Sequence, residues 1–247
     1  MPLMIIWRKT GVINQFRVAL HQLIEGVGDE LILSSGYVSH GSQFSVDDWS
    51  NIFPSLDMAL TNGLEKVTIR AGKFGKHSST ATYNLSALNR VVSAKSSYQE
   101  RYEAFLSNLI PFLINKRKSI RIDAYIHDNW HAKVSVKADN GTPFAAIIGS
   151  SNLTSTAYGN FTNNFNSECD VLIWRLDYHS SNKFRFLYDE NLDGENKKII
   201  HFNSGLDYVF FESLPKSERE FRYDEEYRLN EIYKNVKDAE GGKKVEI

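Results

Sequence analysis

Apolar residues recur along the first half of the chain with two spacings that predict different elements. In residues 12–26, 46–62 and 102–116 they return every three or four positions, like the buried stripe of an amphipathic helix. Residues 30–39 and 66–71 are instead short apolar runs, which are typical of buried strands. Helices and strands therefore alternate along this part of the chain. Such an order predicts an α/β fold in which helices cover a mixed β-sheet.

The central part of the chain predicts three further strands. Residues 120–126 alternate apolar and polar positions, and residues 131–136 continue the alternation, so that side chains two positions apart would share a face. The apolar residues 144–148 predict the next strand. Residues 139–143 are rich in turn formers, which predicts a β-hairpin between the last two strands.

The pattern is weaker after residue 174. Residues 208–211 predict an edge strand, and the charged residues 218–228 predict a helix. We therefore expect a main domain over residues 1–185 and a C-terminal extension, a strand plus a charged helix, over residues 186–247. The pattern leaves open whether this extension packs on the same domain.

Composition is that of an ordinary globular protein. Of the 247 residues, 42% are hydrophobic and 13% aromatic, which suffices for a core and argues against disorder. No apolar run is long enough to cross a bilayer, and residues 1–7 are too short for a signal peptide, so we expect a cytoplasmic protein without a membrane partner. The single Cys169 fits a reducing cytoplasm. The seven histidines are scattered, so no metal site is expected.

Charge is balanced over the chain as a whole but not along it. With 29 Lys and Arg against 30 Asp and Glu, no overall positive charge attracts nucleic acid. Basic residues gather locally at Lys66, Arg70, Lys73 and Lys76, and again in residues 116–121. The second group is better explained as the solvated end of a helix. The first group, with its glycines and the basic Lys73 and Lys76, is the better candidate for a phosphate contact, and Lys73 is the residue expected to bind substrate.

Candidate chemistry is concentrated in two segments that flank the predicted hairpin. His131 and Lys133 supply a nucleophile and a fixed positive charge, two positions apart on the predicted strand. Residues 149–152 read Gly-Ser-Ser-Asn, and such small residues let a backbone approach an anion closely. Phosphoryl transfer without a metal requires this set, an atom that attacks phosphorus and donors that hold its oxygens. We therefore expect His131, Lys133, Ser150 and Asn152 to meet at one phosphate-sized site.

Each segment alone also has an ordinary explanation. A His-x-Lys pair is common on strands, and Asn152 is a residue type that often caps a turn or helix. A lone acid such as Glu168 is usually a solvated strand residue. The joint order of these residues and their strand context favour the catalytic interpretation.

This order resembles the phospholipase D superfamily, whose signature is His-x-Lys, then Asp, then Gly-Ser/Gly-x-Asn. The resemblance is specific over residues 115–175. One element differs, because the position of the signature Asp is Ala138 here and Asp139 lies one residue late, where a strand would point it the other way. The difference is similar to the restriction-endonuclease branch, which lacks that Asp and has a Glu after the Asn. Glu168 takes that place here, and Ser135 also resembles the branch.

The resemblance implies a fold and a set of roles. The main domain would be a phospholipase D-like catalytic α/β domain, with helices on both faces of a mixed β-sheet. His131 would attack phosphorus and form a phosphohistidine, while Lys133 and Asn152 would hold the non-bridging oxygens. Glu168 would orient His131, and Ser150 would donate a hydrogen bond either to the oxyanion or to the His–Glu pair.

Further contacts and a partner follow from the same resemblance. In superfamily members the first strand ends near the site, so Ser35 and Tyr37 would line it, unless they simply end a strand. Ser135 and Lys73 would be further substrate contacts. The His-x-Lys motif occurs once in this chain, and single-motif members complete their site as a homodimer around a two-fold axis. No cofactor is implied.

The function expected from the resemblance is a metal-independent nuclease that cleaves DNA, in bacterial restriction or defence. Nucleic acid would be its substrate, and a separate DNA-recognition or helicase subunit is the partner that such a role suggests. A phospholipase or phosphatidyl transferase is the first alternative. A non-catalytic phosphate-binding module, which the displaced Asp139 keeps open, is the second.

Overall fold

The computed structural model describes residues 3–8, 15–39, 52–72, 98–127, 130–154, 168–175, 199–203, 206–211, 229–239 and 242–245. The strands of its main sheet are β1 (Leu3–Arg8), β2 (Glu30–Ser35), β4 (Lys66–Gly72), β5 (Arg121–His127), β6 (Val134–Asp139), β7 (Thr142–Gly149), β9 (Glu168–Trp174), β10 (Ile199–Asn203), β11 (Leu206–Phe211) and β12 (Lys243–Lys244). Two short strands, β3 (Val38–Ser39) and β8 (Leu153–Thr154), pair separately. The helices are α1 (Gln15–Glu25), α3 (Ile52–Thr61), α4 (Tyr98–Lys116) and the helical residues 229–237.

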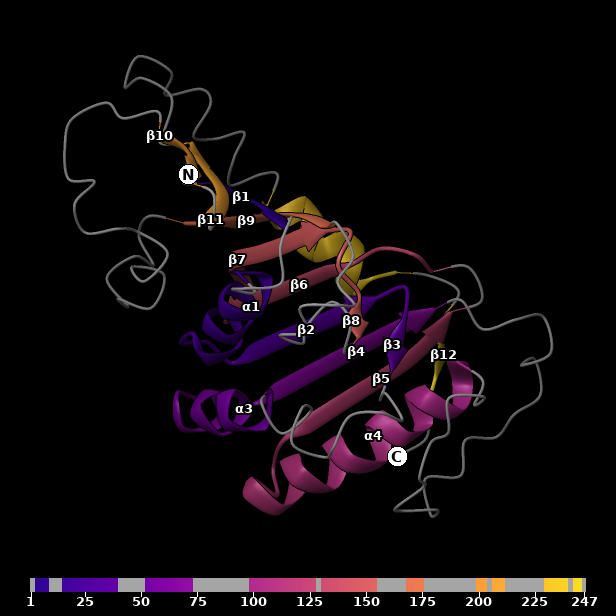
Figure 1. Ribbon diagram of the computed structural model, residues 1–247. Coiled ribbons are helices and arrows are strands. Elements are labelled where there is room, and N and C mark those ends of the chain that lie inside the picture. The colour runs from indigo at the N-terminus through magenta and orange to yellow at the C-terminus, as the bar shows by residue number, and fades with distance from the viewer. Residues whose placement is uncertain are drawn as a thin grey trace.

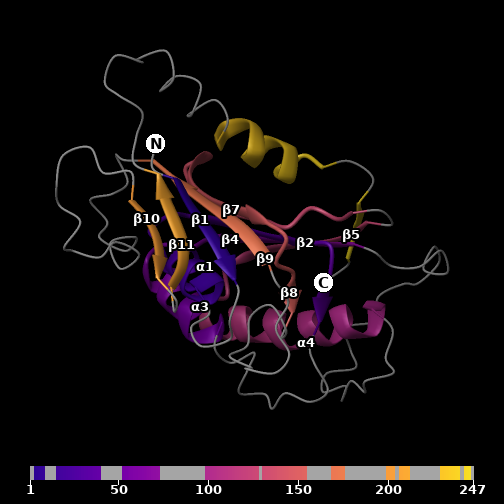
Figure 2. The same ribbon diagram turned by 45° about the horizontal axis from the view of Figure 1, so that its top comes forward.

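The main sheet has ten strands in the order β10-β11-β1-β9-β7-β6-β2-β4-β5-β12 (Figure 1). Neighbours β2, β4 and β5 run parallel, whereas the other pairs are antiparallel, so the sheet is mixed as predicted. Figure 2 shows β10, β11, β1 and β9 following one another at one end of the sheet. Strands from both sides of residue 185 therefore belong to one sheet.

Helices α1, α3 and α4 cover one face of the sheet, called the front face below. Their apolar stripes have the predicted spacing, for example Phe16, Leu20 and Leu23 in α1, which are all buried. Alternate residues of the parallel strands complete this core, because successive strand side chains point to opposite faces. The strand residues include Leu31, Leu33, Val67, Ile69, Ala71, Ala124 and Ile126.

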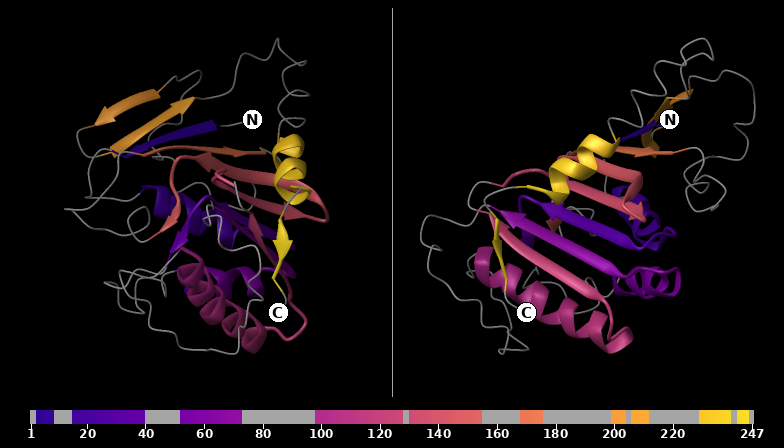
Figure 3. Two further views of the ribbon diagram at one scale, coloured as in Figure 1. Left: turned by 90° about the vertical axis from the view of Figure 1, so that its right-hand side faces the viewer. Right: turned by 180° about the vertical axis from the view of Figure 1, so that it is seen from behind.

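The helical residues 229–237 cover the opposite face, called the back face (Figure 3). Leu229, Tyr233 and Val236 pack there against apolar residues of β2, β6, β7 and β9. The expectation of helices on both faces of a mixed α/β sheet is confirmed. The C-terminal strand β12 then pairs with β5, so that the chain after residue 229 contacts the back face and one edge of the sheet.

The predicted hairpin is present as β6 and β7. Its two-residue turn is Asn140-Gly141, and both residues have positive φ, 49° and 75°, as a tight hairpin turn requires. Asp139 is the last strand residue before this turn and pairs with Thr142. The predicted strand over residues 131–136 was wrong at its beginning, because β6 starts only at Val134. The expected strand 30–39 is likewise divided into β2 and β3 by residues 36 and 37.

Candidate active site

The candidate residues lie at one edge of the sheet. Strands β2, β4 and β5 end there, and β7 ends there as well, because it runs parallel to β2 through two antiparallel pairings with β6. Strands β6 and β9 begin at the same edge. Ligand sites of α/β sheets generally lie outside the carboxyl ends of strands. Sheet topology therefore gathers segments that are far apart in the sequence.

His131 and Lys133 precede β6 and are in contact with each other. Lys133 Nζ lies 2.8 Å from His131 Nδ1 and donates to the His131 carbonyl oxygen at 3.0 Å. The Lys133 carbonyl in turn accepts from the Gly149 amide at 3.1 Å, which joins this segment to the end of β7. His131 is exposed and Lys133 is half-buried. The expected pair is formed, although by an irregular segment instead of a strand.

Two glycines let this segment cross the ends of neighbouring strands. A Cβ on Gly72, at the end of β4, would lie 2.1 Å from the carbonyl oxygen of Trp130. A Cβ on Gly36, just after β2, would lie 3.1 Å from His131 Cα. Trp130 is further held by a 2.7 Å hydrogen bond from its indole N–H to Ser34 Oγ. The backbone before His131 is thus packed directly on β2 and β4.

Ser150 connects the turn after β7 to the start of β9. Its hydroxyl donates to Glu168 Oε2 and accepts from the Cys169 amide at 2.9 Å, while its own amide donates to the Cys169 carbonyl at 3.1 Å. Glu168 is largely buried, with 9% of its surface exposed. Ser150 was expected to donate a hydrogen bond either to the oxyanion or to the His–Glu pair. In the structure its hydroxyl donates to Glu168. Among the described residues no hydrogen bond joins Glu168 to His131.

Asp170 lies two residues after Glu168 on the same face of β9. It is 1% exposed, and its carboxylate accepts from both the amide (3.1 Å) and the hydroxyl of Ser151. A Cβ on Gly149 would lie 2.0 Å from Asp170 Oδ1, so this glycine makes room for the acid. Asp170 was not among the residues predicted for the site. The two-residue spacing from Glu168 was the available signal, because it places both acids on one face of a strand.

Asn152 is held from the side of β2. Its Oδ1 lies 3.3 Å from Ser35 Oγ, and the same hydroxyl accepts from the amide of Leu153 at 3.0 Å. Ser35 Oγ also donates to the Tyr37 carbonyl at 2.6 Å. Ser35 is 0% exposed, whereas Tyr37 and Asn152 are partly exposed. Ser35 thus belongs to the framework beneath the turn, and Tyr37 and Asn152 reach the surface.

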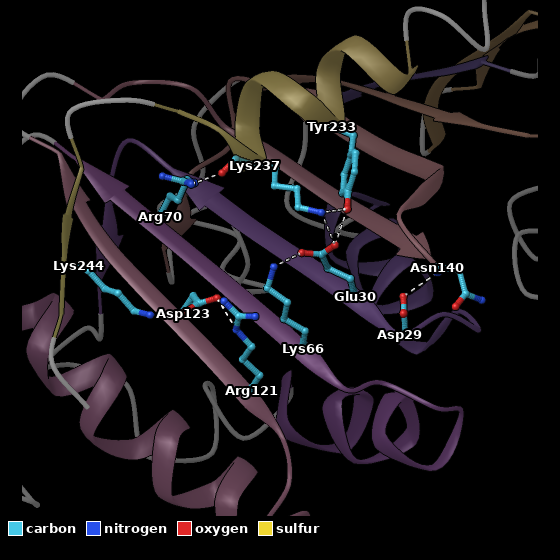
Figure 4. Close-up of polar contacts among 10 residues, drawn as sticks. All are labelled: Asp29, Glu30, Lys66, Arg70, Arg121, Asp123, Asn140, Tyr233, Lys237 and Lys244. Carbon is cyan, nitrogen blue, oxygen red and sulfur yellow. Dashed lines mark hydrogen bonds and ion pairs between the residues drawn. The ribbon is translucent and has the colours of Figure 1, made fainter.

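The other predicted contacts are distributed differently. Ser135 is buried in β6, between its ladder partners Leu33 and Ile147, and Lys73 lies outside the described residues. The basic group around Lys73 was expected to contact phosphate, but two of its members bind other residues of the protein (Figure 4). Lys66 pairs with Glu30 at 2.6 Å, and Arg70, which is 3% exposed, donates to a carbonyl of the C-terminal segment. Their strand positions place them on the back face, which residues 229–239 cover.

Cys169 adjoins the site, and the residue is exposed although its thiol is partly desolvated. Burial and the neighbouring Asp170 carboxylate raise the pKa of its thiol, so that the thiol stays protonated at neutral pH.

Within the part of the chain that the structure describes, no three His, Cys, Asp or Glu side chains gather as a metal ion would need. None of the described helices is long and apolar enough to span a membrane.

Comparison with known proteins gives only remote similarities. The sequence matches no protein-family model and no curated protein. Phosphatidylserine synthase from Haemophilus influenzae Rd KW20 is similar in structure over 74% of this chain and 38% of the synthase, with 12% identity and a TM-score of 0.45. Yeast tyrosyl-DNA phosphodiesterase is similar over 70% of this chain and 46% of that chain, with 11% identity and a TM-score of 0.35. This chain spans less than half the length of each, and both TM-scores are below 0.5.

The geometry itself defines what the site can do. An exposed imidazole lies beside an ammonium group, and the next turn presents a partly exposed amide, Asn152. An imidazole nitrogen is a nucleophile or a proton carrier, and cationic and amide donors stabilise a developing oxyanion. The nearby acid, Glu168, is bound to the turn through Ser150.

Proposed function

We propose that this chain is a phospholipase D-like phosphodiesterase, a nuclease that cleaves DNA without a metal ion through a phosphohistidine on His131. The observation that carries the proposal is the contact between His131 and Lys133 at the strand edge where the Gly-Ser-Ser-Asn turn also ends. These are the residues of the signature recognised in the sequence. The hydrogen bond from the Gly149 amide to the Lys133 carbonyl joins the two segments of the signature, and this proximity supports a common role.

In the proposed reaction, an imidazole nitrogen of His131 attacks phosphorus and the bond to the leaving oxygen breaks. A second histidine protonates that oxygen, and water then hydrolyses the phosphohistidine. Lys133 and the Asn152 amide hold the non-bridging oxygens as charge develops on them. In the free protein Lys133 donates to His131 Nδ1, so a bound phosphate competes with the imidazole for this ammonium group.

The second histidine is proposed to be His131 of another copy of this chain. The His-x-Lys motif occurs once in the sequence, whereas the proposed double displacement uses two histidines. His131 is exposed in the single chain, which leaves it accessible to a two-fold related partner. The functional unit is therefore a homodimer with one shared site.

Restriction or defence is the proposed biological setting, with a separate recognition or helicase subunit as a partner. The support is the departure from the superfamily signature at Ala138 and the acid at Glu168, which resemble the restriction-endonuclease branch. Glu168 is proposed to act on the site through Ser150, which donates to it. A cytoplasmic location is part of the same proposal.

Metal independence and the role of His131 are tested together. Purified protein is incubated with plasmid DNA in excess EDTA, beside His131→Ala and Lys133→Met variants. We expect cleavage that resists EDTA, and a loss of at least about 1,000-fold in His131→Ala, because the nucleophile is absent. Lys118→Met is the matched control, because Lys118 is exposed near the start of β5 and outside the proposed site; its activity should equal that of the wild type.

Parallel assays of the same purified protein separate the alternatives. Hydrolysis of phosphatidylglycerol vesicles without cleavage of DNA would replace the nuclease by a lipid-acting enzyme. Retention of DNA in a mobility-shift assay, with neither activity, would favour the binding module. Cleavage of an RNA of the same sequence at an equal rate would show that the enzyme is not specific for DNA. Cleavage that EDTA abolishes, or that survives in His131→Ala, would refute the proposal.

A further inference from the structure

The turn that carries Ser150 and Asn152 is attached to β9 by a buried acid. Asp170 accepts from the Ser151 amide at 3.1 Å through Oδ1, and from the Ser151 hydroxyl through Oδ2. Both groups are nearly inaccessible, with exposed fractions of 1% for Asp170 and 3% for Ser151. Hydrogen bonds to a carboxylate are stronger than neutral ones, and burial strengthens them further. Asp170 thus fixes the residue that stands between the two candidate site residues.

Gly149 shows how closely the acid and the turn are packed. A Cβ at this position would meet Asp170 at Oδ1, Cα and Cγ, at 2.0, 2.6 and 2.7 Å. Gly149 and Asp170 are also partners in the ladder between β7 and β9. The carboxylate therefore lies over the last residue of β7 and reaches past it to Ser151. A larger residue at Gly149 or a different acid geometry would displace the turn.

The turn is held from its other side by β2. Ser35 Oγ accepts from the Leu153 amide at 3.0 Å and lies 3.3 Å from Asn152 Oδ1. Asn152 therefore lies between two buried attachments, one at Ser151 and one at Leu153. Because Asn152 Oδ1 lies near Ser35 Oγ, the amide nitrogen is the part of this side chain that remains as a donor for a phosphate oxygen.

We propose that Asp170 is a positioning residue for the reaction: it holds the turn through Ser151 and thereby places Asn152 beside His131 and Lys133. This inference rests on the proposed function. Asp170 does not touch the substrate, because Ser151 and the end of β7 occupy its carboxylate. It provides a fixed acid behind the Gly-Ser-Ser-Asn turn, in a chain that has Ala138 where the superfamily signature has its own Asp.

Two variants of Asp170 test the proposal through steady-state cleavage of DNA in EDTA. Asp170→Ala removes both attachments, and we expect kcat/KM to fall about 100-fold, the order of loss that a misplacement of about 1 Å produces. In Asp170→Asn the amide oxygen still accepts from the Ser151 amide, and the amide nitrogen donates to its hydroxyl oxygen. This conservative variant should retain activity within about threefold of the wild type, because the geometry is kept.

A double variant separates positioning from simple damage to the fold. If Asp170 acts by placing Asn152, its removal costs little once that amide is gone. The Asp170→Ala/Asn152→Ala enzyme should then be no more than about threefold less active than Asn152→Ala alone. Losses that add fully, or wild-type activity in Asp170→Ala, would overturn the proposal. The melting temperature of each variant is measured alongside, to show that the compared proteins are folded.

Hydrogen exchange of the turn gives a readout that does not depend on catalysis. In Asp170→Ala, the peptide that contains residues 149–153 should exchange faster than in the wild type, while peptides from β2 and α1 keep their rates. Unchanged exchange in the turn would contradict the proposal whatever the enzyme does. If the wild type shows no cleavage that depends on His131, the proposed function fails instead, and the exchange measurement still decides whether Asp170 holds the turn.

Discussion

At the scale of single residues, His131 has its position because small residues lie beneath it. The backbone of Trp130 and His131 crosses the ends of β4 and β2, where Gly72 and Gly36 leave room for main-chain atoms. A side chain at Gly72 would overlap the Trp130 carbonyl, whereas the overlap at Gly36 is slight. The backbone of the proposed nucleophile can therefore take this position because Gly72 and Gly36 have no side chains.

We predict that Gly36→Ala lowers activity more than stability. Its Cβ would lie 3.1 Å from His131 Cα, so His131 must shift by a few tenths of an ångström. Such a shift at a nucleophile should reduce kcat about tenfold, since rate depends steeply on the distance between reacting atoms. Cleavage rates and melting temperatures are measured for the same preparations.

Gly26→Ala is the matched control. Its Cβ would meet a backbone atom at a similar distance, 3.2 Å from the Leu23 carbonyl oxygen, but at the end of α1 and away from the site. It should share any small change in stability and keep its rate. Equal losses of rate in the two variants would show that crowding itself, and not the position of His131, lowers activity.

At the scale of elements, the C-terminal helical residues 229–237 cover a sheet face on which the charged residues Glu30 and Arg70 are buried. Glu30 there accepts from Lys66 at 2.6 Å and from the Tyr233 hydroxyl, and it pairs with Lys237 at 3.4 Å (Figure 4). Burial and the bond to Glu30 raise the pKa of Tyr233, so its hydroxyl remains a donor at neutral pH. Arg70 donates to the Lys237 and Ala239 carbonyls, which caps the end of this helix.

The helix should lose stability in acid through Glu30. Burial alone would raise the pKa of Glu30, but hydrogen bonds from Lys66 and Tyr233 outweigh burial and lower it below the ordinary value of 4.5. A carboxyl with a lowered pKa stabilises the fold fully above its unfolded-state pKa. This stabilisation is lost as pH falls through the lower folded-state value.

Glu30→Gln isolates this contribution. The melting temperature of the wild type should exceed that of the variant at pH 7, and the difference should shrink below about pH 4.5 as the wild-type carboxylate is protonated. A difference that stays constant down to pH 3 would contradict this assignment. Thermal unfolding at a series of pH values provides the measurement.

At the scale of the whole molecule, the sheet brings the His131–Lys133 segment and the Gly-Ser-Ser-Asn turn to one edge but supplies one His131 per chain. The proposed homodimer predicts how mixed subunits behave. Wild-type and His131→Ala chains are unfolded together in equal amounts and refolded, so that about a quarter of the dimers are wild type in both subunits under random pairing. If both histidines are required, activity should be about half that of the same two proteins refolded separately.

The size of the assembly is measured on the same samples by light scattering. Activity that is unchanged by mixing would mean that each chain works alone. A monomer with full activity at the assay concentration would remove the shared site altogether. Neither result decides whether His131 is the nucleophile, which is tested separately by the cleavage assay of His131→Ala in EDTA.

Local signals in the sequence were enough to predict most elements and the motif. Helical spacing predicted α1, α3 and α4, because apolar residues three or four positions apart lie on one face of a helix and can be buried together. The turn formers at residues 139–143 predicted the hairpin of β6 and β7, which positive φ at Asn140 and Gly141 makes tight. The His-x-Lys and Gly-Ser-Ser-Asn segments could be recognised because their chemistry and order lie in short stretches.

Tertiary structure alone decided which residues support the site and which face of the sheet is buried. Gly72 acts on Trp130, which is far away in the chain, so no local pattern reveals its role. Ser35 was expected near the site, but its bond to the Leu153 amide, like the bond of Asp170 to Ser151, follows only from the tertiary structure. Polar residues of β2, β4 and β5, among them Glu30, Arg70 and Asp123, are buried on the back face because the C-terminal segment supplies partners for them. Sequence determined the elements and the candidate chemistry, and long-range packing determined their geometry.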